Sequence, residues 1–176
     1  MGAVINPGIL PGTNAPRNFL VTALSPSRSD TGPWIFLGGR VWDSSMDVDV
    51  TEETNRDILG NSYTEITDVT VAQDLVWQVN NSLSFPIVAL VDDILDRNAF
   101  TEFAGFPALV IRAYMGTSGS YYATMWPEST ISPQPQGGAG DGGGVDHGIG
   151  LTFGGAPVRG TTNIYLPQQG TLTFTP

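Results

Sequence analysis

The 176-residue sequence contains no cysteine and no lysine, and its one histidine is His147. The absence of cysteine excludes disulfides, a thiolate nucleophile and cysteine-ligated metal sites. A single histidine excludes zinc sites that need two, and a chain without lysine has no P-loop for nucleotide phosphates. No apolar run is long enough to cross a bilayer as a helix, so no membrane partner is expected.

Basic residues of any kind are scarce. Seven arginines stand against 17 acidic residues, which gives a net charge of −10. Such a chain is unsuited to binding nucleic acid by neutralising phosphates. The acidity suits solubility, or a surface along which a polyanion slides without sticking.

Glycine and proline are abundant instead, with 22 and 13 residues, and 40% of the chain is hydrophobic. This length and composition predict a turn-rich β protein with one core. Residues 1–17 include three prolines, and we expect them to form an extended N-terminal segment that is poorly ordered in the isolated chain. The segment does not match a secretory signal. Residues 18–176 are predicted to form a single domain.

A long β-hairpin over residues 46–79 is the dominant local prediction. Met46, Val48 and Val50 alternate with aspartates, which is the period of a half-buried strand. In the returning run most apolar side chains occupy odd positions, namely Tyr63, Val69, Val71, Leu75, Trp77 and Val79, with Ile66, Ala72 and Val76 as exceptions. This run exceeds the five or six residues of an ordinary strand, so the hairpin is predicted to project beyond the core and to need a partner surface.

One helix is predicted after the hairpin. Ser84 can cap it, and Pro86 fits its first turn, where a missing N–H costs nothing. The apolar face of the helix comprises Ile87, Val88, Leu90, Val91, Ile94 and Leu95. We therefore expect this helix to cover one side of a sheet.

Short strands fill most of the remaining chain. They are predicted at residues 18–24, 34–37, 108–114, 121–126, 148–153, 161–166 and 171–175. Residues 134–144 are rich in proline and glycine and predict a mobile loop. The fold class is therefore mainly β: a sandwich or barrel with one flanking α-helix and a long projecting hairpin.

Motifs for catalysis or cofactor binding are not convincing. Residues 138–143 match G-x-G-x-x-G, but no strand is predicted before them and no helix after them, so a dinucleotide site is not expected. His147 lies beside a glycine tract without a G-x-S-x-G motif, and we interpret it as a loop-edge, solvent-facing histidine. We expect no catalytic residue and no cofactor.

Four carboxylates of the first hairpin strand form the one candidate cation site. They are Asp47, Asp49, Glu52 and Glu53. Calcium prefers such oxygen ligands, and Asp47 and Asp49 share a strand face. A solvated strand face explains the same pattern more simply, so no metal is predicted.

The order of these segments resembles a known family. An acidic strand at residues 48–54 and a polar tip precede a return strand that opens with Tyr63-Thr64-Glu65. A helix, the strand 109–114, a hairpin to residues 123–126 and a late Gly-rich strand at 145–157 follow. This pattern, over roughly residues 34–160, resembles the major tail (tail tube) proteins of long-tailed bacteriophages. The resemblance is one of pattern and not of an invariant motif.

The resemblance implies a non-enzymatic structural virion protein that forms homo-oligomeric, hexameric rings stacked into a tail tube. The implied partners are a tape-measure protein and other tail proteins, with DNA passing transiently through an acidic conduit during ejection. Location in the virion tail, after assembly in the host cytoplasm, is also implied. Long hairpins fit this role because their edges can pair with neighbouring subunits.

The tip of the hairpin is the predicted assembly interface. Gly60 and Asn61 supply turn chemistry, while Ile58 and Leu59 are apolar in a polar loop and are the expected contact; the alternative is a local hydrophobic turn. We expect the tip to cross to an adjacent subunit or ring. The predicted interface residues are Thr54, Asn55, Arg56, Asp57, Ile58, Leu59, Gly60, Asn61 and Ser62.

Two alternatives belong to other classes. One is a surface-displayed β-sandwich binding module, such as a virion decoration or carbohydrate-binding protein, with Trp34, Trp42 and Trp126 as stacking platforms. Trp77 is expected in the core. The other is a small hydrolase with Asp/Glu catalysis, for which no paired-carboxylate pattern is present.

Overall fold

The computed structural model describes residues 14, 19–37, 41–78, 85–134, 136–137, 145–166 and 170–176. Side chains at 41–44, 77–78 and 85 are not part of this description. Apart from Asn14, the predicted N-terminal segment lies outside the described residues, as do Ser84, Val79 and most of the predicted loop at 134–144. The division into an N-terminal segment and one domain therefore stays a prediction.

The described chain is mainly β and confirms the predicted fold class. Its strands are β1 (Leu20–Leu24), β2 (Ile35–Phe36), β3 (Val41–Arg56), β4 (Ser62–Gln78), β5 (Phe106–Thr117), β6 (Ser120–Pro133), β7 (Asp146–Phe153), β8 (Val158–Thr162) and β9 (Phe174–Thr175). Helix α1 spans Phe85–Asp96, and a 3₁₀ helix, η2, spans Phe100–Phe103. Every pairing between strands is antiparallel in the described residues.

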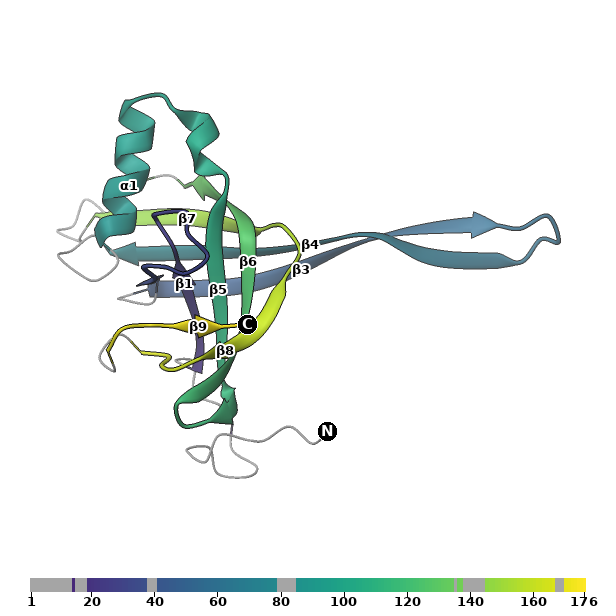
Figure 1. Cartoon of the computed structure of the whole chain (residues 1–176). Coiled ribbons are helices and arrows are strands. Elements are labelled where there is room, and N and C mark those ends of the chain that lie inside the picture. The colour runs from purple at the N-terminus through teal and green to yellow at the C-terminus, as the bar shows by residue number, and fades with distance from the viewer. Residues whose placement is uncertain are drawn as a thin grey trace.

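The strands form one continuous sheet that folds back on itself. The order is β2-β1-β5-β6-β7-β4-β3, and β8 branches from β6 and carries β9. The first part of β6 pairs with β5 and β8, whereas residues 130–133 of β6 pair with β7. Because β6 serves both halves, it forms the corner of the fold, and the two halves cross steeply in Figure 1.

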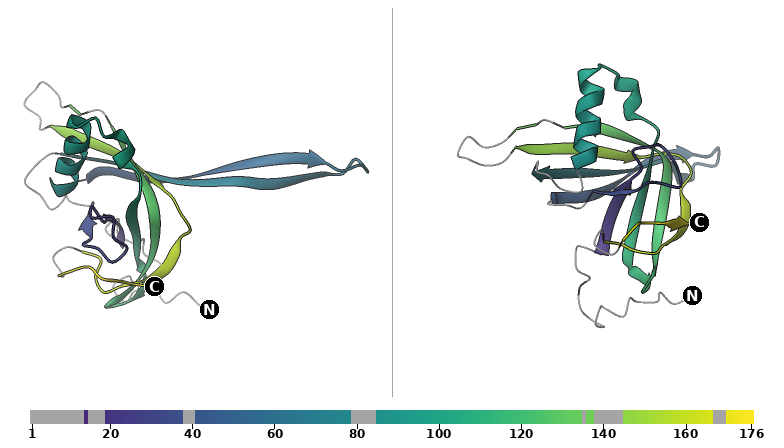
Figure 2. Two further views of the ribbon diagram at one scale, coloured as in Figure 1. Left: turned by 45° about the horizontal axis from the view of Figure 1, so that its top comes forward. Right: turned by 60° about the vertical axis from the view of Figure 1, so that its left-hand side comes forward.

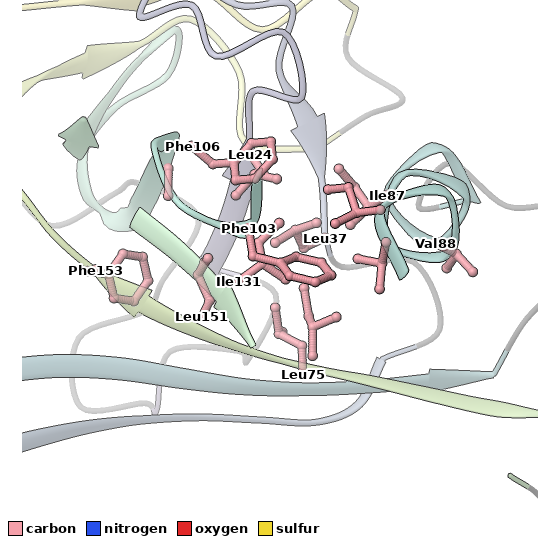
Figure 3. Packing of buried hydrophobic residues seen from close by; sticks show 14 of the residues in the cluster. Leu24, Leu37, Leu75, Ile87, Val88, Phe103, Phe106, Ile131, Leu151 and Phe153 are labelled. Carbon is pink, nitrogen blue, oxygen red and sulfur yellow. The ribbon is translucent and has the colours of Figure 1, made fainter. Parts of the chain in front are cut away.

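Helix α1 closes the larger of two hydrophobic core clusters. Ile87, Val88, Val91 and Ile94 are buried and pack with residues from both halves of the sheet, among them Leu24, Leu75, Phe106, Ile131, Leu151 and Phe153. Figure 3 shows this packing beside the helix. Leu90 and Leu95 are half-buried against the same cluster, so the predicted apolar face is confirmed. Pro86 lies in the first turn as expected.

A surface ion-pair network follows the helix. Arg97 contacts Asp93 at 2.8 Å and Glu102 of η2 at 2.9 Å. Hydrogen bonding from Arg97 lowers the pKa of the Glu102 carboxyl below its ordinary value. The contacts connect the end of α1 to η2 on the exposed surface.

Among the described residues, no helix is long and apolar enough to span a membrane.

The second core cluster lies between β1, β2, β5 and β6 and the C-terminal residues. Its buried side chains include Phe36, Leu109, Ile111, Tyr121, Met125, Ile164 and Leu172. Tyr165 covers one end, with its ring centroid 4.8 Å from that of Tyr121. Most of the short strands are therefore where the alternating pattern predicts them. The strand predicted at 161–166 was placed too late, since β8 spans Val158–Thr162, and the strand predicted at 171–175 was too long, since β9 contains two residues.

Candidate assembly surface

The hairpin of β3 and β4 extends far beyond the part that pairs with the rest of the sheet. Residues 71–78 of β4 pair with β7, but residues 62–70 pair only with β3. We call residues 49–70 the arm, and the other described residues the body. Nine residues of β4 extend the arm about 30 Å at about 3.3 Å per residue. Figures 1 and 2 show the arm leaving the body as a single two-stranded ribbon. The predicted projection is confirmed.

The arm has no core of its own. Every residue from Asp47 to Thr70 is exposed except Asn55, which is half-buried. A lone two-stranded ribbon is marginally stable in water, because neither face is covered. The base of the same hairpin is fixed differently: Leu75 and Gln73 are buried in the body, and Gln73 accepts a 2.6 Å hydrogen bond from Thr22 of β1.

A bulge divides the arm into two registers. Thr51 pairs with Asp68 and Glu52 pairs with Ile66, so Thr67 has no residue opposite it. The extra residue reverses the odd–even pattern of β4 beyond this point. Val69, Val71 and Leu75 share one face as expected, but the prediction that Tyr63 joins them is wrong. Ile66, an exception in the sequence pattern, takes that face instead.

One face of the arm is apolar, and we call it the valine face. Opposed residues project from the same side of an antiparallel pair. Val50 faces Val69 and Val48 faces Val71, with Ile66 opposite Glu52 one step further out. This face continues into the body, where Val71 packs against the larger core cluster, while Val48, Val50, Ile66 and Val69 are exposed. Buried packing therefore ends in the middle of an apolar stripe.

The opposite face is acidic, and we call it the acidic face. Its pairs from base to tip are Ser45–Asp74, Asp47–Ala72, Asp49–Thr70, Thr51–Asp68, Glu53–Glu65 and Asn55–Tyr63. Glu53 and Glu65 lie directly opposite each other, an arrangement that repels and does not help an isolated ribbon. Gly150 of β7 continues this face, because a Cβ there would lie 3.1 Å from the Asp74 carboxylate. This face is thus acidic, and at Gly150 no side chain projects from it.

The four carboxylates of the candidate cation site do not converge. Asp47, Asp49 and Glu53 lie on the acidic face, whereas Glu52 lies on the valine face opposite Ile66. Across the residues that the structure describes, no group of three or more His, Cys, Asp or Glu side chains has metal-binding geometry. The strand alternation separates ligands that are neighbours in sequence.

The predicted interface residues form the outer end of the arm. Thr54 contacts Thr64 across the strands, hydroxyl to hydroxyl, at 3.0 Å. Asn55, Arg56 and Ser62 complete the last pairs of the ladder. The turn itself comprises Asp57, Ile58, Leu59, Gly60 and Asn61, and Gly60 has the positive φ of +85° that favours glycine. No partner surface within the described chain covers this tip.

Asp57 holds the tip in a fixed conformation. Its carboxylate accepts hydrogen bonds from the Leu59 and Asn61 amides at 2.9 and 2.8 Å, and from the Asn61 side chain at 3.0 Å. These bonds, that of the Asn61 side chain first, lower the pKa of Asp57. Ile58 and Leu59 are 102% and 81% exposed. The turn therefore points two apolar side chains into solvent.

His147 corrects a prediction. Instead of a solvent-facing loop residue, it is the second residue of β7 and is 1% exposed. Its Nε2 lies 2.9 Å from Gln136 Nε2 and 3.4 Å from Asp92 Oδ1 of α1. The alternation of His147 with Ile149, Leu151 and Phe153 in odd positions already indicated an inward side chain. The residue connects the helix to the sheet.

The tryptophans offer little support for a stacking platform. Trp34 is buried in the second core cluster. Trp126 is half-buried and contacts Phe153 with ring centroids 5.8 Å apart. The side chains of Trp42 and Trp77 lie outside the described residues. Two of the three proposed platform residues are accordingly packed against core residues.

Comparisons with solved structures find chains of similar fold. A chain in the tail of an empty gene transfer agent (GTA) particle, determined with C6 symmetry, aligns with 82% of this chain and 98% of its own length at a TM-score of 0.56 and 12% identity. A chain of the native GTA virion aligns with 93% and 100% of the two chains, at a TM-score of 0.53 and 12% identity. A chain of the anti-feeding prophage tube-terminating cap aligns with 87% and 95%, at a TM-score of 0.51 and 11% identity.

Sequence comparisons give no further relatives. No family model matches the sequence, and no curated protein sequence is significantly similar to it. At 11–12% identity the structural likeness concerns the fold. The chain therefore shares its fold with proteins of phage-like tails and injection tubes, as its resemblance to tail tube proteins implied.

Proposed function

We propose that this chain is a structural tail tube protein that assembles into stacked rings around an acidic channel. The observation that carries the proposal is the arm with its two different faces. Its valine face continues the core but has no cover, and its acidic face crowds carboxylates in opposed pairs. An isolated subunit gains nothing from either feature, whereas an assembly can bury one face and use the other.

Contact between copies would begin at the sheet edge. β3 is the last strand in the sheet order, and its sixteen residues have β4 as their one strand neighbour in the described chain. An edge strand of this length is a template for pairing with another chain. If the neighbouring subunit also packs over the valine face, it removes exposed apolar area from water, at about 25 cal/mol per Å².

The acidic face would then line the channel. Asp47, Asp49, Asp68 and Asp74, with Glu53 and Glu65, give it negative charge, and the one arginine of the arm, Arg56, lies on the valine face. DNA passing such a wall meets no side chain that neutralises its phosphates. We propose that the acidic wall prevents DNA from binding to the channel as it passes.

The solved neighbours support a place in a tail or tube assembly. One was determined with C6 symmetry in a tail, and others come from a tube terminator or cap. We infer hexameric rings, contacts with a tape-measure protein and other tail proteins, and location in the virion tail after assembly in the host cytoplasm. The role is structural and non-enzymatic.

Electron microscopy of the purified protein at rising concentration tests the proposal. Rings or tubes with a stain-filled channel are the expected result, and their formation should depend steeply on protein concentration. Discrete monomers at every concentration, together with binding on a glycan array, would favour the surface-displayed binding module instead.

A further inference from the structure

The body carries an open hollow that no described part of the same chain fills. It has a volume of about 650 Å³ and lies between β5, β6 and β8, on the side of the sheet away from the second core cluster. Its wall includes Arg112, Met115, Tyr122, Trp126, Pro157 and Arg159. The volume is within the range of roughly 300–1,000 Å³ that is usual for ligand clefts.

Strand alternation explains the chemistry of the hollow. Tyr121, Ala123 and Met125 of β6 point into the core, so Tyr122, Thr124 and Trp126 point the other way. Arg112 of β5 donates a 2.9 Å hydrogen bond to Thr124, which fixes the guanidinium at the floor. Apolar side chains thus share one site with two of the seven arginines of the chain.

Charge separates the hollow from the arm. Among the described residues, none of those lining the hollow is acidic, and neither Arg112 nor Arg159 is paired with a carboxylate. The arm, in contrast, carries Asp49, Glu52, Glu53, Asp57, Glu65 and Asp68 against one arginine. Opposite charges on two surfaces favour their encounter and fix their orientation.

We propose that the hollow receives Ile58 and Leu59 from the arm tip of a second copy of this chain. This inference rests on the proposed function and names the receiving surface of the arm. The two apolar side chains would contact Met115, Tyr122 and Trp126. The arginines would face Glu52 and Asp57, the two carboxylates of the arm that are not among those proposed to line the channel. The turn held by Asp57 presents Ile58 and Leu59 before contact, which lowers the entropy cost of docking.

The geometry requires a second copy. The arm runs away from the body as a two-stranded ribbon (Figure 2), and its length is about 30 Å. The hollow is lined by residues of the body. A tip cannot fold back onto its own hollow without breaking the β3–β4 ladder. Docking is therefore intermolecular and repeats from subunit to subunit.

Engineered disulfides test the docking in a chain that has no native cysteine. Leu59→Cys and Tyr122→Cys variants of the full chain are mixed, assembled into tubes and oxidised. A bridge needs Cα atoms roughly 4.4–6.8 Å apart, so it reports close approach. We expect a covalent dimer in the mixture on a non-reducing gel. The control mixture pairs Leu59→Cys with Asp96→Cys, an exposed residue of α1, and should give no dimer above either variant alone.

A charge reversal supplies a second readout if a cysteine variant fails to assemble. Arg159 is exposed, so Arg159→Glu should leave the melting temperature unchanged but raise the concentration needed for tubes by about tenfold or more, because like charges would then meet. Arg159→Gln should fall between. Tubes without the Leu59–Tyr122 dimer, or an unchanged assembly concentration for Arg159→Glu, would overturn the docking while leaving the proposed function intact. Failure of the unmodified chain to assemble would overturn the proposed function itself.

Discussion

Leu75 and Val69 lie six residues apart on the same strand and on the same face, yet Leu75 is 2% exposed and Val69 is 51% exposed. The body covers the first side chain with core residues, and nothing in the described chain covers the second. Both positions follow one hydrophobic alternation. The comparison shows that one pattern serves a covered side chain at the base and an exposed one along the arm, which is where the proposed neighbour would bind.

The body and the arm should respond differently to substitution. A change in the body removes contacts that fold the chain, so it should lower the free energy of unfolding. A change in the exposed arm removes no such contacts and should alter assembly alone. The following predictions test this division, in order of decreasing effect on the stability of the subunit.

The largest loss is expected in the helix-covered core. Ile94→Asp places a charge at a fully buried position and should cost about 3–5 kcal/mol, because no partner is available for the new carboxylate. Val91→Asp should act alike. Thermal or urea unfolding followed by circular dichroism measures the loss. Asp96→Ala, on the exposed side of the same helix, is the matched control and should stay within about 0.5 kcal/mol.

A smaller loss is expected where the base of the arm joins the body. Thr22→Val removes the 2.6 Å hydrogen bond to Gln73 at a buried site and should cost about 1–2 kcal/mol. Thr22→Ser retains the hydroxyl and should lose less. Equal stability of the valine and serine variants in urea unfolding would show that this bond does not help to anchor the arm.

On the arm, stability and assembly should separate. Val50→Asp alters an exposed residue, so the unfolding free energy of the subunit should change by no more than about 0.5 kcal/mol. Tube formation, measured by sedimentation, should nevertheless fall sharply because the new charge would be buried against a neighbour. The control is Asp49→Asn, which changes the preceding residue on the acidic face. This variant should still assemble. Similar assembly by both variants would contradict a covered valine face.

The smallest effect is a local titration at the tip. The pKa of Asp57 is lowered in the folded turn, so its stabilisation is complete above the ordinary value of about 3.9 and is lost as the pH falls through the lowered value. The amide resonances of Leu59 and Asn61 should shift in that acidic range while the rest of the spectrum stays folded. Asp57→Asn should abolish this transition, and a wild-type tip insensitive to acid would disprove the role of the carboxylate.

Sequence patterns predicted the secondary-structure elements better than they predicted which side chains are exposed. The alternation around Val48 and Val50 correctly indicated a strand, and the helix face was found from its spacing. Exposure could not follow from the same pattern, because alternation signals a covered face without saying which molecule covers it. For that reason the sequence pattern did not distinguish exposed Val69 from buried Leu75.

Local irregularities explain the clearest errors. The bulge at Thr67 reversed the face of Tyr63 and moved Ile66 onto the valine face, and no glycine or proline in this strand marks it. His147 was assigned to solvent from the glycines before it, although the strand after it indicated burial. The hollow between β5, β6 and β8 depends on strand pairing far apart in the chain, so sequence alone did not reveal it.

The central claim is that the body folds the subunit and the arm assembles it. Replacing residues 54–62 with a short Asn-Gly turn, and measuring melting and tube formation on the same sample, tests it most directly. We predict an unchanged melting temperature and circular dichroism spectrum, with tubes absent or severely weakened in electron microscopy and sedimentation. Tubes of normal length and stability from the shortened chain would contradict the claim.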